Sequence, residues 1–137
     1  GAVKAVSKAI PELKGVLTGN AIRVPTPNVS LAVLVLNLKE EVTKVDLNEF
    51  LKNSAFTSKY RQIIGYTNSP EAVSTDFYSS PFATIIDSQA TIAEGTQVTL
   101  YCWYDNEFGY SKQVLNLTKK VAKIELPRFP RAIDTSV

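Results

Sequence analysis

The apolar run at residues 31–38 constrains the fold of this chain more than any other feature. It reads LAVLVLNL, in which only Asn37 is polar. A strand with one face in water alternates apolar and polar residues, whereas a strand buried on both faces is apolar nearly throughout. The run has the length of a strand and is far shorter than the roughly 18–20 residues that span a bilayer. We therefore expect a strand that is covered on both faces, or covered by a partner subunit.

Three segments have the periodicity of helices. Residues 1–13 carry apolar side chains at helical spacing, and Pro11 makes the end of this helix ambiguous. A second helix begins at about Asp46, which is placed to cap it. A third helix follows Gly109 and gathers its apolar residues on one side.

The remaining regular segments are predicted strands. Besides residues 31–38, they are residues 20–24, 83–87, 90–93 and 97–104. Glu94 and Gly95 form a hairpin signal between the last two of these. The order of helices and strands predicts an α+β domain with a mixed, largely antiparallel sheet and helices on one face. We assign residues 1–123 to this domain and residues 124–137, with their prolines and arginines, to a tail.

The composition excludes several classes of protein. The 137 residues carry a formal charge of only +2, and positive residues are dispersed among acidic ones, so we expect no nucleic-acid partner and no membrane span. The single cysteine, Cys102, precludes an internal disulfide and is compatible with a reducing compartment. Because no segment has the form of a signal peptide, we expect the cytoplasm or an organelle interior, not secretion.

Two absences restrict the chemistry of the chain. It contains no histidine, the side chain best suited to proton transfer near neutral pH. It also contains no G-x-G-x-x-G motif, so it lacks the usual signature of a dinucleotide-binding unit. Cys102 lies in a predicted strand without a neighbouring cation and is expected to be a small buried hydrophobe. We therefore predict no catalytic residue and no metal site in these residues.

Three motifs resemble signatures of the phosphorylating glyceraldehyde-3-phosphate dehydrogenases. Residues 23–30 read RVPTPNVS, residues 73–77 read VSTDF and residues 103–111 read WYDNEFGYS, in the order found in that family. Residues 1–17 resemble the helix that precedes the first motif. The resemblance covers about residues 1–122 and implies an incomplete catalytic domain of the dehydrogenase type, of which this is the C-terminal part. The start of the chain in a helix without an N-cap, and its lack of methionine, also lead us to expect missing upstream residues.

The resemblance implies roles for four residues. Arg23 would bind the phosphate of the substrate or inorganic phosphate, to which a guanidinium fork is suited, and the backbone of Gly1 would belong to the same region. Asn106 would hydrogen-bond the nicotinamide carboxamide of NAD, and Tyr110 would lie near that ring. Residues 79–82 depart from the family pattern, which usually carries an arginine or a serine-rich stretch there.

Without the resemblance, the same residues have ordinary structural interpretations. Arg23 would be a surface or interface ion-pair partner. Asp105 and Asn106 would end a strand and bond their own backbone in a turn. Trp103 and Phe108 would be aromatic residues of the core.

The family reaction is the NAD-dependent oxidation and phosphorylation of glyceraldehyde 3-phosphate in a homotetramer. It requires a thiolate that attacks the aldehyde and a histidine that activates the thiolate, and both lie upstream of the region represented here. We therefore expect the chain alone to be inactive and to use NAD or NADP only within the full-length enzyme. Its partners would be the missing N-terminal half and sister subunits.

Two alternatives remain at this point. The chain could be a non-catalytic structural or interaction subunit of a larger assembly, derived from a dehydrogenase domain and held by other proteins. It could also be a binder of phosphate or a small anion that uses Arg23. The presence together of Arg23, Asn106 and Tyr110 favours the enzyme, because a chain without catalytic duty has no chemical need for all three.

Overall fold

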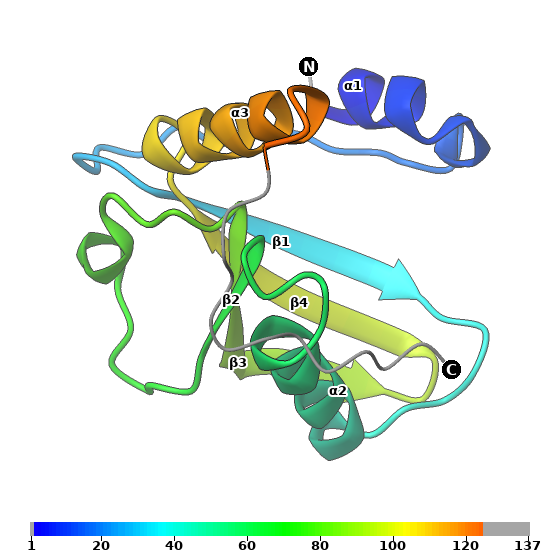
Figure 1. The fold of residues 1–137 in the computed structure, drawn as a ribbon. Coiled ribbons are helices and arrows are strands. Elements are labelled where there is room, and N and C mark those ends of the chain that lie inside the picture. The colour runs from blue at the N-terminus through cyan, green and yellow to red at the C-terminus, as the bar shows by residue number, and fades with distance from the viewer. Residues whose placement is uncertain (1, 125–137) are drawn as a thin grey trace.

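The computed structural model describes residues 2–124. These residues form a four-stranded sheet with the strand order β1-β4-β3-β2 (Figure 1). In chain order the elements are α1 (Ala2–Ala9), the 3₁₀ helix η1 (Pro11–Leu13), β1 (Ser30–Asn37), α2 (Lys44–Phe56), β2 (Ile64–Thr67), the 3₁₀ helix η2 (Ser74–Phe77), β3 (Thr84–Glu94), β4 (Gln97–Tyr104) and α3 (Phe108–Val121). Gly1 and the tail from residue 125 onward lie outside the described residues.

The sheet is mixed and largely antiparallel, which confirms the predicted α+β class. β4 pairs antiparallel with both β1 and β3, and only β2 and β3 run parallel. The β3–β4 hairpin turns at Gly95, whose φ of 58° lies in the left-handed region that glycine adopts at little cost. The hairpin predicted at Glu94 and Gly95 is therefore confirmed.

The core lies between one face of the sheet and α2. Its buried members are Ile86, Val98, Leu100 and Cys102, all on β3 or β4. Leu47 and Leu51, the apolar side chains one turn apart on α2, pack against this cluster among other partly buried residues. The burial of Cys102 confirms its expected role as a small hydrophobe.

The predicted cap of α2 is wrong by three residues. Thr43 is the N-cap, because its side-chain oxygen accepts a hydrogen bond from the Asp46 amide at 3.1 Å. The Thr43 hydroxyl in turn donates to the Asp46 carboxylate at 2.7 Å. Asp46 therefore lies in the first helical turn and is not the N-cap. Its negative charge there interacts favourably with the helix dipole.

Two predicted strand segments differ from the structure. Residues 20–24 are irregular, because no strand of the described chain pairs with them and the nearby prolines 25 and 27 offer no backbone donors. The predicted segments 83–87 and 90–93 form a single strand, β3, with a shift of register between Asp87 and Ile92. At this shift the backbone amides of Gln89 and Ala90 donate hydrogen bonds to the Asp87 carboxylate.

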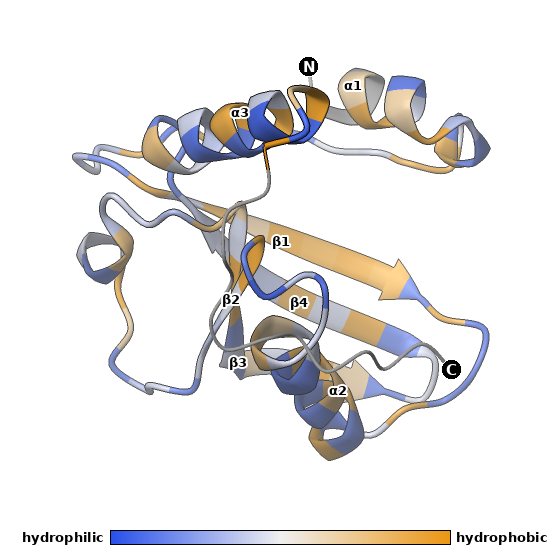
Figure 2. Ribbon diagram, viewed as in Figure 1, coloured by the Kyte–Doolittle hydropathy of each residue, from blue (hydrophilic) through white to orange (hydrophobic). Residues whose placement is uncertain are grey.

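The other face of the sheet carries exposed apolar residues. β1 is the predicted apolar strand, yet Val33 and Val35 are 51% and 62% exposed. Both lie opposite β4 residues on the face that α2 does not cover, and β1 is apolar along nearly its whole length (Figure 2). Within the described residues, the expectation of cover on both faces is therefore not met. The alternative, cover by a partner subunit, remains a prediction.

The first and last helices lie above the sheet in the view of Figure 1. The helix predicted over residues 1–13 is shorter in the structure, because α1 ends at Ala9 and Pro11 begins the separate 3₁₀ helix η1. α3 has several exposed apolar side chains, including Leu117 and Val121. No helix of residues 2–124 has the length and apolar character needed to cross a membrane.

Candidate functional site

The three motifs that carry the family resemblance meet where β4 ends and α3 begins. Asn28 of the first motif donates a hydrogen bond from its amide nitrogen to Asp105 Oδ2 of the third motif at 3.2 Å. Phe77 of the second motif packs against Trp103 of the third, with 5.5 Å between ring centroids. Segments far apart in the sequence therefore form one local structure around the predicted residue Asn106.

Asp105 is the centre of this structure. It is only 3% exposed, and its carboxylate accepts four hydrogen bonds. Oδ1 accepts from the amides of Glu107 and Phe108, both at 2.9 Å, and thereby caps the start of α3. Oδ2 accepts from the Ser79 amide at 2.9 Å as well as from Asn28. These four hydrogen bonds offset the free-energy cost of burying the charge of the carboxylate.

The hydrogen bonds also set the ionisation of Asp105. Burial raises the pKa of this carboxyl, but the amides of Phe108, Ser79 and Glu107 and the side chain of Asn28 together lower it further than burial raises it. The net pKa lies below the ordinary value of 3.8. The carboxylate is therefore charged at neutral pH, as its four donors require.

Two neighbours of Asp105 have unusual backbone conformations. Val29, next to Asn28, has a φ of 69°, and Ser79 has a φ of 58°. For a β-branched residue such as Val29 this is a rare and strained conformation that the surrounding structure must hold. Ser79 donates to Asp105, and Val29 follows Asn28, whose side chain also donates to Asp105, so the carboxylate bonds to both strained segments.

The start of α3 is seated on the loop at residues 79–82. A Cβ atom added to Gly109 would lie 2.6 Å from the backbone oxygen of Phe82, so only glycine permits this approach. Gln113 Nε2 donates to the backbone oxygen of Pro81 at 3.0 Å. The loop at residues 79–82 therefore supports the helix that follows Asn106.

The three predicted site residues within residues 2–124 are exposed. Asn106 is exposed at the end of β4, and Tyr110, in the first turn of α3, is 71% exposed. Arg23 is exposed in the irregular segment that leads to Asn28, and no hydrogen bond or ion pair of its side chain is found among the described residues. Phe108, expected as a core aromatic if the resemblance is ignored, is 48% exposed, so that expectation is wrong. Trp103 is partly buried, and its Nε1 donates to Asp87 at 3.1 Å.

The turn predicted at Asp105, in which its side chain bonds the nearby backbone, is confirmed by the hydrogen bonds from the amides of Glu107 and Phe108. Sequence reasoning overlooked only the distant partners of Asp105, which are Asn28 and Ser79. Its bonds to Asn28 and Ser79 span 77 and 26 residues and have no local signature.

The side chains suited to metals or nucleophilic attack do not form a site in the described part of the chain. No group of three or more His, Cys, Asp or Glu residues that could hold a metal ion occurs between residues 2 and 124. Burial raises the pKa of the Cys102 thiol above its ordinary value. The thiol is therefore protonated at neutral pH and is a poor nucleophile.

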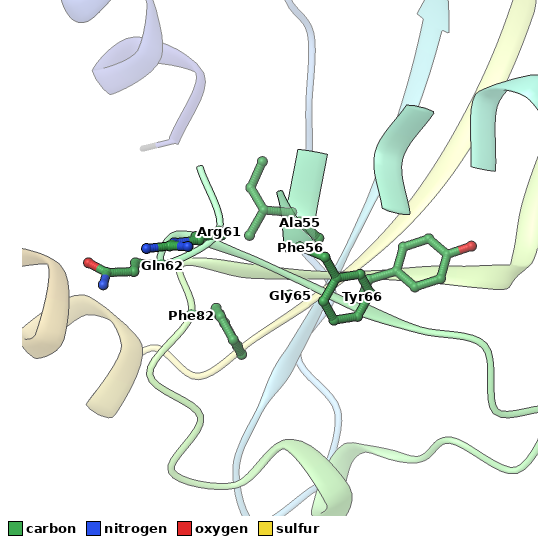
Figure 3. Close-up of a pocket in the computed structure, with 8 residues that line it drawn as sticks. Ala55, Phe56, Arg61, Gln62, Gly65, Tyr66 and Phe82 are labelled. Atoms are coloured by element: carbon green, nitrogen blue, oxygen red, sulfur yellow. The ribbon is translucent and has the colours of Figure 1, made fainter. Parts of the chain in front are cut away.

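A separate hollow lies beside the C-terminal end of α2 (Figure 3). Its volume is about 350 Å³, and its lining includes Phe56, Arg61, Tyr66 and Phe82. Phe82 packs closely on Gly65, where a Cβ atom would lie 2.8 Å from the ring. None of the predicted site residues lines this hollow.

Comparison with known proteins agrees with the three motifs. The family described as glyceraldehyde 3-phosphate dehydrogenase, C-terminal domain, matches residues 1–106. The chain is 51% identical over 131 residues to a glyceraldehyde-3-phosphate dehydrogenase-like protein of Pseudomonas aeruginosa, a match that covers 96% of this chain and 28% of the relative. It is 46% identical over 123 residues to glyceraldehyde-3-phosphate dehydrogenase 2 of Bacillus subtilis, covering 89% of this chain and 36% of the relative.

The matches also define how much of the family these residues represent. The chain spans about a third of the length of these two relatives. The family match includes Asn28, Asp105 and Asn106, the residues at the meeting point of the three motifs. The chain belongs to the glyceraldehyde-3-phosphate dehydrogenase family, of which it represents a C-terminal part.

Proposed function

We propose that this chain forms the C-terminal part of the catalytic domain of an enzyme that oxidises and phosphorylates glyceraldehyde 3-phosphate with NAD or NADP. The observation that carries the proposal is that the side chains of Arg23, Asn106 and Tyr110 are exposed and have no partner within residues 2–124. Polar groups that the fold itself does not use are available for ligands.

The chemistry of these groups fits the proposed ligands. The Arg23 guanidinium can donate a fork of hydrogen bonds to phosphate oxygens. The Asn106 amide offers both donors and an acceptor, and so complements a carboxamide such as that of nicotinamide. The nicotinamide cofactor supplies the hydride acceptor when it is bound. The role of Asn106 is to orient the ring, and Tyr110 on the first turn of α3 limits the space beside it.

The remaining parts of the site come from outside these residues. The 137 residues contain no histidine, and their only cysteine is buried in the core. The thiolate and the acid–base group of the reaction are therefore supplied by the upstream part of the enzyme, and the chain alone is inactive. A non-catalytic structural subunit is not favoured, because the relatives carry dehydrogenase names.

The exposed apolar surfaces fit a larger assembly. The uncovered sheet face around Val33 and Val35 is a surface for a sister subunit, and the exposed side of α3 is a surface for the nucleotide-binding part. The enzyme would thus be a homotetramer in the cytoplasm or an organelle interior, with no nucleic-acid partner.

The proposal is tested in a chimera, in which this chain replaces the matching C-terminal segment of the Bacillus subtilis relative. The variant Arg23→Ala should raise the KM for inorganic phosphate by at least about ten-fold, since it removes a charge-assisted contact. Arg61→Ala is the matched control, because Arg61 lies in the separate hollow. An equal effect of both substitutions would contradict the assignment of Arg23.

The cofactor role of Asn106 is tested in the same chimera. The variant Asn106→Ala should raise the KM for NAD by about ten-fold, as expected for the loss of one hydrogen bond to the ligand. Asn116→Ala, later in α3, is the control and should leave this KM unchanged. A normal KM for NAD in Asn106→Ala would refute the proposed contact with nicotinamide.

A further inference from the structure

We propose that Asp105 is a positioning residue, which holds Asn106 and the segment bearing Arg23 in one fixed arrangement. The inference rests on the proposed function, because Asn106 and Arg23 are the groups that it positions. Asp105 itself is 3% exposed and touches no ligand in this account. Its effect on the reaction passes through its hydrogen-bond partners.

Hydrogen bonds to Asp105 hold the backbone on both sides of Asn106. Asp105 Oδ1 accepts from the amides of Glu107 and Phe108, the two residues that follow Asn106. The backbone oxygen of Asp105 also accepts from the Gly109 amide at 3.1 Å. Asn106 thus lies inside a closed loop of hydrogen bonds, which fixes the direction in which its exposed side chain leaves the backbone.

Asp105 also bonds to the segment that carries Arg23. Asp105 Oδ2 accepts from the Asn28 side chain, and Asn28 lies only five residues after Arg23. The same oxygen accepts from the Ser79 amide. A single carboxylate therefore connects the candidate nicotinamide contact, the candidate phosphate contact and the loop that supports α3.

The hydrogen bonds at this position require a carboxylate. Four donors point at Asp105, and a carboxylate has acceptor sites for all of them without a donor of its own. An amide of the same shape would turn its NH₂ group toward one pair of donors. Asp105→Asn therefore keeps the volume of the side chain but breaks one side of the connection.

The strained backbone supports the same inference. Val29 and Ser79 both have left-handed φ values, and each lies at or beside a donor to Asp105. Strained positions of this kind persist only where surrounding contacts hold them. Release of the carboxylate contacts allows these segments to relax, which moves Arg23 and Asn106 relative to each other.

The test uses the chimera with the variants Asp105→Asn and Asp87→Asn. Asp87 is the matched control: it is also buried, at 8% exposed, and accepts from three donors, but it lies in the irregular part of β3. We expect Asp105→Asn to raise the KM for NAD and for phosphate by about ten-fold each, at temperatures where the protein stays folded. Asp87→Asn should lower the melting temperature but leave both KM values within about two-fold.

A second substitution distinguishes positioning from general stability. In the double variant Asp105→Asn with Asn28→Asp, a carboxylate at position 28 accepts from the new amide at position 105. We expect this pair to recover part of the lost affinity for NAD and phosphate, because the contact with position 28 is restored while the Ser79 amide still faces an NH₂ group. If Asp105→Asn does not fold, Asn28→Ala breaks one bond to Asp105 and leaves the cap of α3 in place. It should then raise the KM for phosphate about three-fold.

The results of these experiments show whether the positioning role of Asp105 or the proposed function is at fault. If Asn106→Ala and Arg23→Ala change the KM values but folded Asp105→Asn does not, the positioning role is wrong and the proposed function stands. The same conclusion follows if Asn28→Ala has a normal KM for phosphate. If Asn106→Ala and Arg23→Ala have no effect, the proposed function fails first.

Discussion

Four hydrogen-bond donors converge on the Asp105 carboxylate, and this arrangement couples the stability of the fold to pH. The pKa of Asp105 is lower in the folded chain than its ordinary value, which represents the unfolded chain. A lowered pKa means that the ionised group stabilises the fold at all pH values above the unfolded-state pKa. The contribution declines as the pH falls below about 4 and is lost once the pH passes through the folded-state pKa.

The first prediction follows from this dependence. At pH 7, Asp105→Asn should lower the free energy of unfolding of the chain by about 2–3 kcal/mol, because charged hydrogen bonds are lost. The difference between the two proteins should shrink below about pH 4, where the wild-type carboxylate gains a proton in the unfolded state. Urea unfolding at a series of pH values measures both quantities. Parallel pH profiles for the two proteins would refute the prediction.

A second prediction concerns the contact at Gly109. Replacement of a helical glycine by alanine normally stabilises a helix by about 0.5–1 kcal/mol. Here the new methyl group would lie 2.6 Å from the backbone oxygen of Phe82, so Gly109→Ala should instead destabilise the chain by about 1–3 kcal/mol. Thermal unfolding measures the effect, and Ser111→Ala, exposed in the same helix, serves as control. A gain in stability from Gly109→Ala would show that the helix is not seated on this loop.

The sequence predicts only those parts of the candidate site that lie within a single contiguous motif. Asn106 and Tyr110 belong to one contiguous motif, so their nearness to each other was implied before the structure was known. The partnership of Asp105 with Asn28 and Ser79 was not, because these residues are 77 and 26 positions away. No local pattern records which distant donor a buried carboxylate will meet.

The strands that were predicted correctly are those with which another strand pairs in the fold. The apolar run at residues 31–38 was correctly predicted as a strand, because it pairs along its length with β4. Residues 20–24 have a comparable local pattern but no pairing strand in the described chain, and they are irregular. β-propensity is expressed only where a neighbouring strand completes the hydrogen bonds.

The start of α2 gives a third prediction. Thr43, and not the predicted Asp46, is the N-cap of this helix. Thr43→Ala should lower the free energy of unfolding by about 1 kcal/mol, the usual effect of a lost cap. Thr118→Ala is the control, because its hydroxyl bonds only the preceding turn of α3. Chemical denaturation of the two variants compares them, and equal stabilities would contradict the assignment of Thr43.

Among residues 2–124, the sheet has one face that α2 covers and one face with exposed apolar side chains. α2 packs on the first, whereas Val33 and Val35 stand exposed on the second. An apolar strand at the edge of a sheet with an uncovered face is typical of a surface that another chain buries. The sequence indicated this surface through the apolar run at residues 31–38, but it could not show which of the two faces α2 leaves open.

A fourth prediction tests the role of that face in assembly. In the chimera, Val33→Asp should reduce the size of the oligomer, because a charge cannot be buried against a sister subunit without a partner. Val45→Asp is the control, since Val45 is 73% exposed on α2 and away from this face. Light scattering gives the mass of each assembly. An unchanged tetramer in Val33→Asp would show that the uncovered face is not a subunit interface.

We propose that this chain provides a working C-terminal part of a glyceraldehyde-3-phosphate dehydrogenase. The most direct measurement is the rate of NADH formation from glyceraldehyde 3-phosphate, NAD and phosphate by the chimera with the Bacillus subtilis relative, with the chain alone assayed beside it. We predict phosphate-dependent activity in the chimera and none in the chain alone. A chimera that folds, assembles and binds NAD but forms no NADH would contradict the account.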